Sequence, residues 1–126
     1  MPTILIVDDE DNLRLLYRKE LEEQGFEVIE AASAEEGLRL FEEKRPDLVV
    51  LDIRMPGMNG LEAMAQVLDR DRRVPIVLHT AYDSYRDDFT SWAADAYVTK
   101  GADTAELIRT IRRLLEERAH LGPPEL

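Results

Sequence analysis

The chain alternates short apolar runs with longer amphipathic stretches, and this alternation occurs five times. Each run is rich in valine, isoleucine, leucine or an aromatic residue and is too short for a helix. Several runs contain no polar residue, which is typical of a parallel strand covered on both faces. The pattern predicts five strands: Ile4–Val7, Phe26–Ile29, Leu48–Leu51, Pro75–Leu78 and Ala96–Val98.

The stretches between the runs contain helix start and stop signals. We expect Asp11 to cap the first helix, which ends before Gly25. Capping boxes, in which glutamate follows the capping residue by three positions, begin the helices after Ser33, Asn59 and Asp103. The stretch Ser84–Ala93 has few apolar positions and predicts a weak helix.

Five strands, each followed by a helix, predict an α/β doubly wound parallel sheet with helices on both faces. We expect the strand order 2-1-3-4-5, in which the chain reverses between the first and third strands. Ligands bind at such a reversal, outside the carboxyl ends of the strands. The residues predicted at that edge are Asp8 and Asp9, Asp52, His79 and Thr80, and Thr99 and Lys100.

Composition narrows the class of protein. The length of 126 residues fits one domain, and no apolar run approaches the ~18 residues of a membrane span. The start at Met1 lacks a secretory signal, so we expect a soluble, cytoplasmic protein. The chain has no cysteine and two histidines, so a metal would be held by oxygen. A net charge of −11 argues against direct binding to nucleic acid.

The four neighbouring carboxylates of Asp8-Asp9-Glu10-Asp11 repel one another, so a positive charge nearby is needed to stabilise them. A bound cation and the positive end of a helix are both available. We assign Asp8 and Asp9 to a cation site shared with Asp52, and Glu10 and Asp11 to the following helix. The hard divalent ion that suits such carboxylates is Mg²⁺.

Lys100 and Thr80 complete a site for phosphoryl chemistry. Lys100 would neutralise an incoming phosphoryl group, and the Thr80 hydroxyl would donate to another of its oxygens. Asp52 is then the natural nucleophile, because phosphoryl transfer depends mainly on positioning and charge neutralisation.

These residues resemble the receiver domain of two-component response regulators, and the resemblance covers the whole chain. It rests on Asp8-Asp9, Thr80, Lys100 and the segment Leu51-Asp52-Ile53-Arg54-Met55-Pro56-Gly57-Met58-Asn59-Gly60. The resemblance implies a flavodoxin-like (βα)5 three-layer sandwich, with a receiver domain at 1–120 and a tail or linker start at 121–126.

The resemblance also implies a cofactor and partners. Mg²⁺ would be held by Asp9, Asp52, the Arg54 backbone carbonyl and waters, with Asp8 acting partly through water. A sensor histidine kinase, a phosphotransfer protein or a small phosphodonor would supply the phosphoryl group to Asp52. A downstream protein target or output domain would respond, and a homodimer formed on phosphorylation stays open.

Thr80 and Tyr97 match the switch pair of the family. Phosphorylation would draw the hydroxyl in, the aromatic ring would follow, and the stretch Ser84–Ala93 would repack. Arg54 and Tyr82 lie where the family tunes attack of water on the phosphoryl group. The alternative, two exposed loop side chains, stays open.

The sequence departs from the family at Gly101, where proline joined by a cis bond is usual. A cis bond before a non-proline residue costs about 2.5–4 kcal/mol, so either that strain is kept or the bond is trans. The departure leaves open an adaptor with a degenerate pocket that binds partners without phosphorylation.

Two other functions fit less well. A phosphatase of the haloacid dehalogenase type needs a second acid two residues after its nucleophile, where this chain has Arg54. A flavodoxin-like electron carrier needs a hydroxyl-rich phosphate loop after the first strand, where this chain has acids that repel phosphate.

Overall fold

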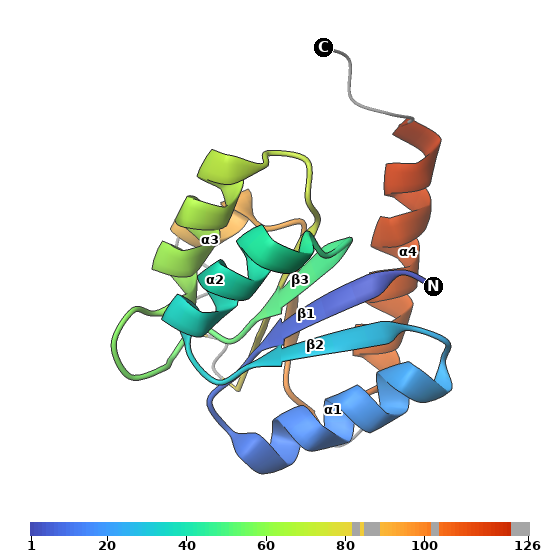
Figure 1. Cartoon of the computed structure of the whole chain (residues 1–126), viewed down its shortest axis with the longest axis horizontal. Coiled ribbons are helices and arrows are strands. Elements are labelled where there is room, and N and C mark those ends of the chain that lie inside the picture. Colours follow the sequence, from blue (N-terminus) through green and yellow to red (C-terminus); the bar gives the residue numbers. More distant parts are fainter. Residues whose placement is uncertain (82–83, 85–88, 102–103, 122–126) are drawn as a thin grey trace.

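A computed structural model describes residues 1–81, 84, 89–101 and 104–121 of the chain (Figure 1). Its centre is a sheet of five parallel strands in the order β2-β1-β3-β4-β5. The strands are β1 (Thr3–Val7), β2 (Glu27–Ala31), β3 (Leu48–Leu51), β4 (Ile76–Thr80) and β5 (Ala96–Thr99). The predicted parallel sheet and its strand order are confirmed.

Helices cover both faces of this sheet and produce three layers (Figure 1). Helices α1 (Asp11–Glu23) and α4 (Ala105–Leu121) pack on one face. Helices α2 (Ala34–Lys44) and α3 (Gly60–Arg70) pack on the other. None of the helices in the described part of the chain is long and apolar enough to cross a membrane.

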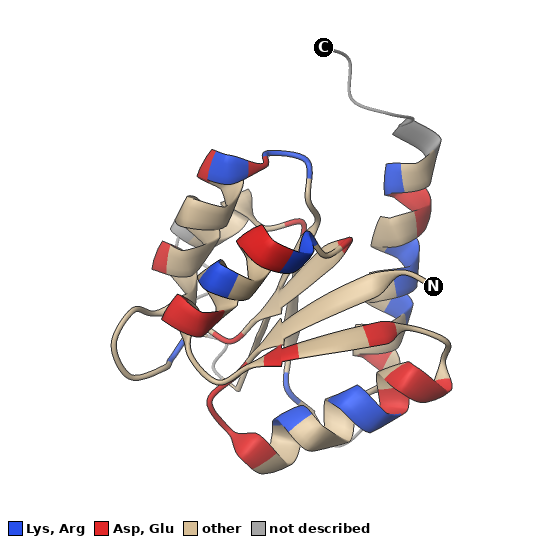
Figure 2. Cartoon of the chain, in the orientation of Figure 1, with Lys and Arg blue, Asp and Glu red and all other residues tan. Residues whose placement is uncertain are grey.

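Strand β1 explains why the apolar runs lack polar residues. Ile4 and Ile6 pack toward α1 and α4, whereas Leu5 and Val7 pack toward α2 and α3. Successive side chains of a strand point to opposite faces, and here each face is covered by helices. Figure 2 shows the consequence, because charged residues lie on the helices, the loops and β2 but not on β1 or β3.

Two predicted helix caps are confirmed. Ser33 Oγ accepts a hydrogen bond from the Glu36 amide at 3.1 Å. Asn59 Oδ1 accepts one from the Glu62 amide at 3.0 Å. Each bond satisfies an amide that the first turn of α2 or α3 would otherwise leave unpaired.

The predicted cap of α1 is wrong. The helix begins at Asp11 itself, and Glu10 occupies the capping position without a side-chain capping bond. The Glu10 carboxylate instead lies 3.3 Å from Lys100 Nζ, and the Asp11 carboxylate accepts a hydrogen bond from Arg14. The capping residue expected for the last helix, Asp103, lies outside the described residues.

The stretch Ser84–Ala93 differs from the α-helix that we expected. Its described end, Phe89–Ala93, is a short 3-10 helix, η2, and residues 85–88 lie outside the described residues. The Trp92 side chain in η2 is 72% exposed, so it does not form part of an apolar stripe that would hold a regular helix against the sheet.

Gly60 lets α3 begin directly against the end of β3. A Cβ atom at this position would stand 2.0 Å from the backbone oxygen of Asp52. The Gly60 amide also donates to the Ile53 carbonyl at 2.8 Å. The start of α3 therefore supports the backbone that carries Asp52.

Candidate functional site

Three charged side chains meet at the carboxyl edge of the sheet. Asp8 follows β1, Asp52 follows β3 and Lys100 follows β5. The hydrogen bonding of the sheet continues into these residues. The Asp52 amide donates to the Val7 carbonyl at 2.9 Å, and the Lys100 amide donates to the Thr80 carbonyl at 2.7 Å. Regular strands thus bring residues far apart in sequence to one place.

Lys100 bridges the two buried acids. Its Nζ lies 2.8 Å from Asp8 Oδ2 and 3.0 Å from Asp52 Oδ2. The side chains of all three residues are at most 7% exposed. Charges withdrawn from water to this extent need partners, and here each of them has one.

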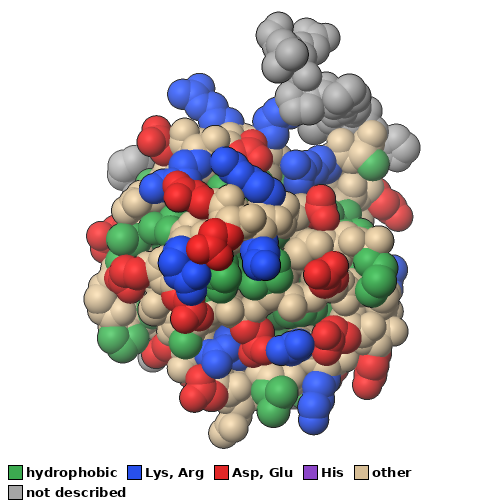
Figure 3. Space-filling model, viewed as in Figure 1, with side chains coloured by type: hydrophobic (Ala, Val, Ile, Leu, Met, Phe, Trp, Pro, Cys, Tyr) green, Lys and Arg blue, Asp and Glu red, His purple; other side chains and the backbone are tan. Residues whose placement is uncertain are grey.

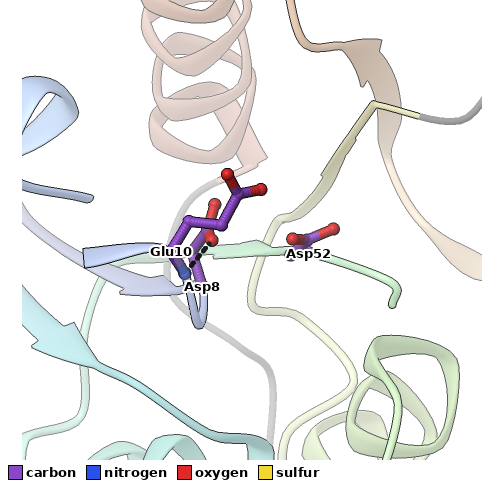
Figure 4. Close-up of side chains that lie close together, drawn as sticks. All are labelled: Asp8, Glu10 and Asp52. Atoms are coloured by element: carbon purple, nitrogen blue, oxygen red, sulfur yellow. Dashed lines mark hydrogen bonds between the residues drawn. The ribbon is translucent and has the colours of Figure 1, made fainter. Parts of the chain in front are cut away.

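Glu10 also belongs to this group, so its predicted assignment to the helix alone is wrong. Its Oε1 lies 3.3 Å from Lys100 Nζ, and its amide donates to Asp8 Oδ1 at 2.9 Å (Figure 4). Carboxylate oxygens of Asp8, Glu10 and Asp52 lie within 4.8 Å of one another. Glu10 follows Asp8 by two positions, and the same-side rule for extended chains could have indicated it.

Asp9 is exposed, between two residues that contact Lys100. Within the described part of the chain, the acids that converge are Asp8, Glu10 and Asp52. The role of Asp9 as a metal ligand stays a prediction.

The electrostatics of the site follow from its burial. Burial raises the pKa of Asp52 and the Asp8 charge adds to this, while Lys100 opposes both. Burial alone would lower the pKa of Lys100, but its hydrogen bond to Asp8 and the charges of Asp52 and Asp8 raise it overall. Lys100 is therefore charged at neutral pH, and one ammonium is shared among several carboxylates.

The other predicted residues of strands β4 and β5 lie beside this centre. Thr80 ends β4, is fully buried and pairs in register with Thr99. Tyr97 is partly buried and packs against the core on the α2 and α3 side of the sheet. His79 is buried, and its ring and that of Tyr17 are in an edge-type arrangement with 4.9 Å between the ring centroids.

The remaining predictions for the site concern Arg54, Tyr82 and the peptide bond after Lys100. Arg54 is exposed, and Tyr82 lies outside the described residues. Among the peptide bonds that the structure describes none is cis, so the bond between Lys100 and Gly101 is trans. Lys100 reaches both buried acids with this trans bond.

Arg14 is a contact of the site that the sequence did not indicate. Its guanidinium donates to the Asp8 carbonyl oxygen at 2.7 Å and to Glu30 Oε1 at 3.0 Å. The position of Arg14 on a predicted helix does not indicate a role at the site, because the charged end of an arginine on a helix is usually solvated.

The donor set fits a hard divalent cation. Carboxylates from the ends of two strands and from Glu10 provide oxygen ligands at one point, and such ligands suit Mg²⁺. A carboxylate nucleophile beside a fixed ammonium also suits transfer of a phosphoryl group.

Comparison with known proteins agrees with this geometry. The family model for the response regulator receiver domain matches residues 4–112. The transcriptional regulatory protein AfsQ1 of Streptomyces coelicolor is 38% identical over 91% of this chain and 52% of its own length. The regulatory protein AtoC of Escherichia coli is 38% identical over 90% of this chain and 25% of its own length. The chain thus spans about half or less of these curated relatives.

Solved structures match more completely. The response regulator TrrA of Thermotoga maritima, in complex with Mg²⁺-BeF, is 45% identical with a TM-score of 0.88, covering 90% of this chain and 99% of that one. TrrA in complex with the histidine kinase ThkA gives 45% identity, a TM-score of 0.86 and coverage of 91% and 99%. The chain therefore belongs to the family of response regulator receiver domains of two-component systems.

Proposed function

We propose that Asp52 accepts a phosphoryl group and that this modification switches the surface of the protein for partner binding. The observation that carries the proposal is the ammonium of Lys100, held 3.0 Å from Asp52 and 2.8 Å from Asp8 at the reversal of the sheet. A buried carboxylate beside a cation can attack phosphorus while the developing charge is neutralised.

The transfer moves one phosphoryl group between two nucleophiles. A carboxylate oxygen of Asp52 forms a bond to phosphorus as the bond to the donor nitrogen of a phosphohistidine breaks. The departing imidazole nitrogen takes up a proton. Lys100 then pairs with phosphoryl oxygens, and the Thr80 hydroxyl donates to another of them.

The acids at the site support a role for Mg²⁺. Asp9, Asp52 and the Arg54 carbonyl would hold the ion, with Asp8 acting partly through water. Glu10 is also available, because it clusters with Asp8 and Asp52. When bound, Mg²⁺ neutralises the acids and binds phosphoryl oxygens.

The response is proposed to travel through Thr80 and Tyr97. A dianionic group on Asp52 attracts the buried Thr80 hydroxyl, which frees space for the partly buried Tyr97 ring. The surface of η2, β5 and α4 then changes, and the exposed Trp92 lies on it. A downstream protein, an output domain or a second copy of this chain would bind there.

A sensor histidine kinase or a phosphotransfer protein would be the donor. The complex of the relative TrrA with the histidine kinase ThkA supports this choice. Direct binding to nucleic acid is not part of the proposal, because the net charge is −11. On the face in Figure 3, acidic and basic side chains are also interspersed rather than gathered into a basic patch.

Arg54 and Tyr82 are proposed to set the lifetime of the phosphoryl group. Arg54 is exposed two residues beyond Asp52, where a bulky side chain can obstruct an attacking water. The lifetime of the acyl phosphate in an Arg54→Ala, Tyr82→Ala variant tests this. We expect faster hydrolysis than in the wild type, and an unchanged lifetime would refute the role.

A beryllofluoride titration tests the switch without a kinase. With Mg²⁺ present, backbone amide resonances around Asp52, Thr80 and Tyr97 should shift in the wild type but not in Asp52→Asn. A wild type that does not respond would favour the alternative, an adaptor with a degenerate pocket. Gly101 is the feature that favours this alternative.

A further inference from the structure

Arg14 ties three elements together beneath the acidic turn. Its guanidinium donates to the Asp8 carbonyl oxygen at 2.7 Å, to Glu30 Oε1 at 3.0 Å and to Asp11 Oδ1 at 2.8 Å. The Arg14 side chain is only 14% exposed, although it lies on a surface helix. The contacts join α1, β2 and the turn that follows β1.

The contact with Asp8 has a particular consequence for the acids. The Asp8 carbonyl belongs to the planar peptide group that connects Asp8 to Asp9. A donor that holds this oxygen therefore sets the plane from which the Asp9 backbone continues. On the side-chain side of the same residue, Asp8 Oδ1 accepts from the Glu10 amide at 2.9 Å. The turn is thus held at two points.

Glu30 anchors the guanidinium from the neighbouring strand. It projects from β2 and accepts from Arg14 through Oε1 and from Arg18 through Oε2, the latter at 2.7 Å. Arg18 thus shares the Glu30 partner, but the contacts of its guanidinium are with Glu30 and Glu22 rather than with the turn. The two arginines share the ion pair with Glu30, and Arg14 alone of the two also contacts Asp8 and Asp11.

We propose that Arg14 is a positioning residue for the divalent cation site, orienting Asp8 and Asp9 toward Asp52 through its bond to the Asp8 carbonyl. The inference rests on the proposed function, because it concerns the affinity of that site for Mg²⁺. Groups that orient metal ligands in this way typically contribute 10–100-fold to metal affinity.

Charge and position make opposite predictions here. Arg14 is a cation near the site, so its charge alone repels Mg²⁺, and removing that charge would strengthen Mg²⁺ binding. If Arg14 acts by orienting the turn, its removal weakens binding instead. Lysine retains the charge but lacks the planar fork that serves three acceptors at once, so it does not replace arginine.

Calorimetric titration with Mg²⁺ alone separates the two effects. We expect Arg14→Met and Arg14→Lys to bind Mg²⁺ about tenfold more weakly than the wild type. We expect the control Arg18→Met, which also removes an ion pair with Glu30, to stay within about twofold of the wild type. Circular dichroism confirms that each titrated variant is folded, and Arg14→Lys carries the test if Arg14→Met does not fold.

Each remaining outcome overturns the inference. Wild-type affinity in Arg14→Lys, or equal or tighter binding in Arg14→Met, would mean that the fork does not orient the acids. An equal loss in Arg18→Met would assign the effect to the Glu30 ion pairs as a whole. A wild type that binds no Mg²⁺ would overturn the proposed cofactor as well, whereas the other outcomes leave it intact.

Discussion

Lys100 makes its shortest ion pair with Asp8, at 2.8 Å between Nζ and Oδ2, and not with the proposed phosphoacceptor Asp52, at 3.0 Å. In the absence of a phosphoryl group, the lysine therefore serves as the counter-ion of both buried acids. A single residue proposed for catalysis also stabilises the fold at this edge of the sheet.

Removing this counter-ion should destabilise the protein. We expect Lys100→Met to lower the free energy of unfolding by about 3 kcal/mol at neutral pH without divalent ions, because two buried carboxylates lose their partner. Urea denaturation measures the change. The control Lys19→Met removes an exposed lysine and should change stability by at most about 0.5 kcal/mol. Similar stabilities of the two variants would contradict the role of Lys100.

His79 should make stability depend on pH. Burial lowers its pKa from 6.5 to about 4, with the charge of Lys100 acting in the same direction. Between these values the unfolded chain binds a proton that the folded chain rejects. The contribution of neutral His79 to the free energy of unfolding is fully present above pH 6.5. It decreases by about 3 kcal/mol in total as the pH drops toward 4.

A ring without a titratable nitrogen provides the control for this effect. As the pH falls from 7 to 4, we expect the free energy of unfolding of the wild type to decrease more than that of His79→Phe. Urea denaturation measures both values. Phenylalanine keeps an aromatic ring beside Tyr17. A difference that stays constant with pH would contradict a buried neutral His79.

The strands and the edge that carries the site could be predicted from the sequence, for a physical reason. Strands buried on both faces are typically apolar throughout, so runs such as Ile4–Val7 and Leu48–Leu51 indicate buried parallel strands. Once the order of parallel strands is known, the residues that follow them are expected along one edge, where Asp8, Asp52 and Lys100 meet.

Other details of the site depend on the direction of side chains in a turn. The two-residue spacing from Asp8 is a sequence signal for Glu10, whereas the contacts of Arg14 have no such signal. Glu10 and Asp11 are adjacent acids, yet only Glu10 contacts Lys100, while Asp11 begins the helix. Arg14 donates both to the Asp8 carbonyl and to Glu30, which lies on the neighbouring strand β2. No pattern of spacing in one sequence encodes such a three-part contact.

Gly60 should be required for the position of Asp52. A Cβ atom there would stand 2.0 Å from the Asp52 backbone oxygen, and backbone cannot move aside as a flexible side chain can. We expect Gly60→Ala to lower the free energy of unfolding by about 1–3 kcal/mol and to slow phosphorylation. Thermal denaturation and acetyl phosphate kinetics measure these effects.

Gly101 provides the matched control for this substitution. Among the described residues other than its chain neighbours, no atom lies within 4 Å of a Cβ built on Gly101, although it follows the site residue Lys100. Gly101→Ala should therefore change stability by at most about 0.5 kcal/mol. Equal effects of the two alanine substitutions would show that the close approach at Gly60 is unimportant.

The two acids after Asp8 should respond differently to loss of charge. We expect Asp9→Asn to abolish Mg²⁺-dependent phosphorylation, because the ion would lose a carboxylate ligand. Glu10 pairs with Lys100 at 3.3 Å, and its side chain is 55% exposed, so Glu10→Gln should leave most of the activity intact. Rates with Mg²⁺ and acetyl phosphate decide between them, and the reverse order would assign the metal role to Glu10.

The most direct measurement is the intact mass of the protein after incubation with Mg²⁺ and acetyl phosphate. Our account predicts that the wild type gains the mass of one phosphoryl group. It predicts no gain when EDTA is added before acetyl phosphate, and none in Asp52→Asn. An unmodified wild type, or a phosphoryl group that Asp52→Asn still accepts, would contradict it.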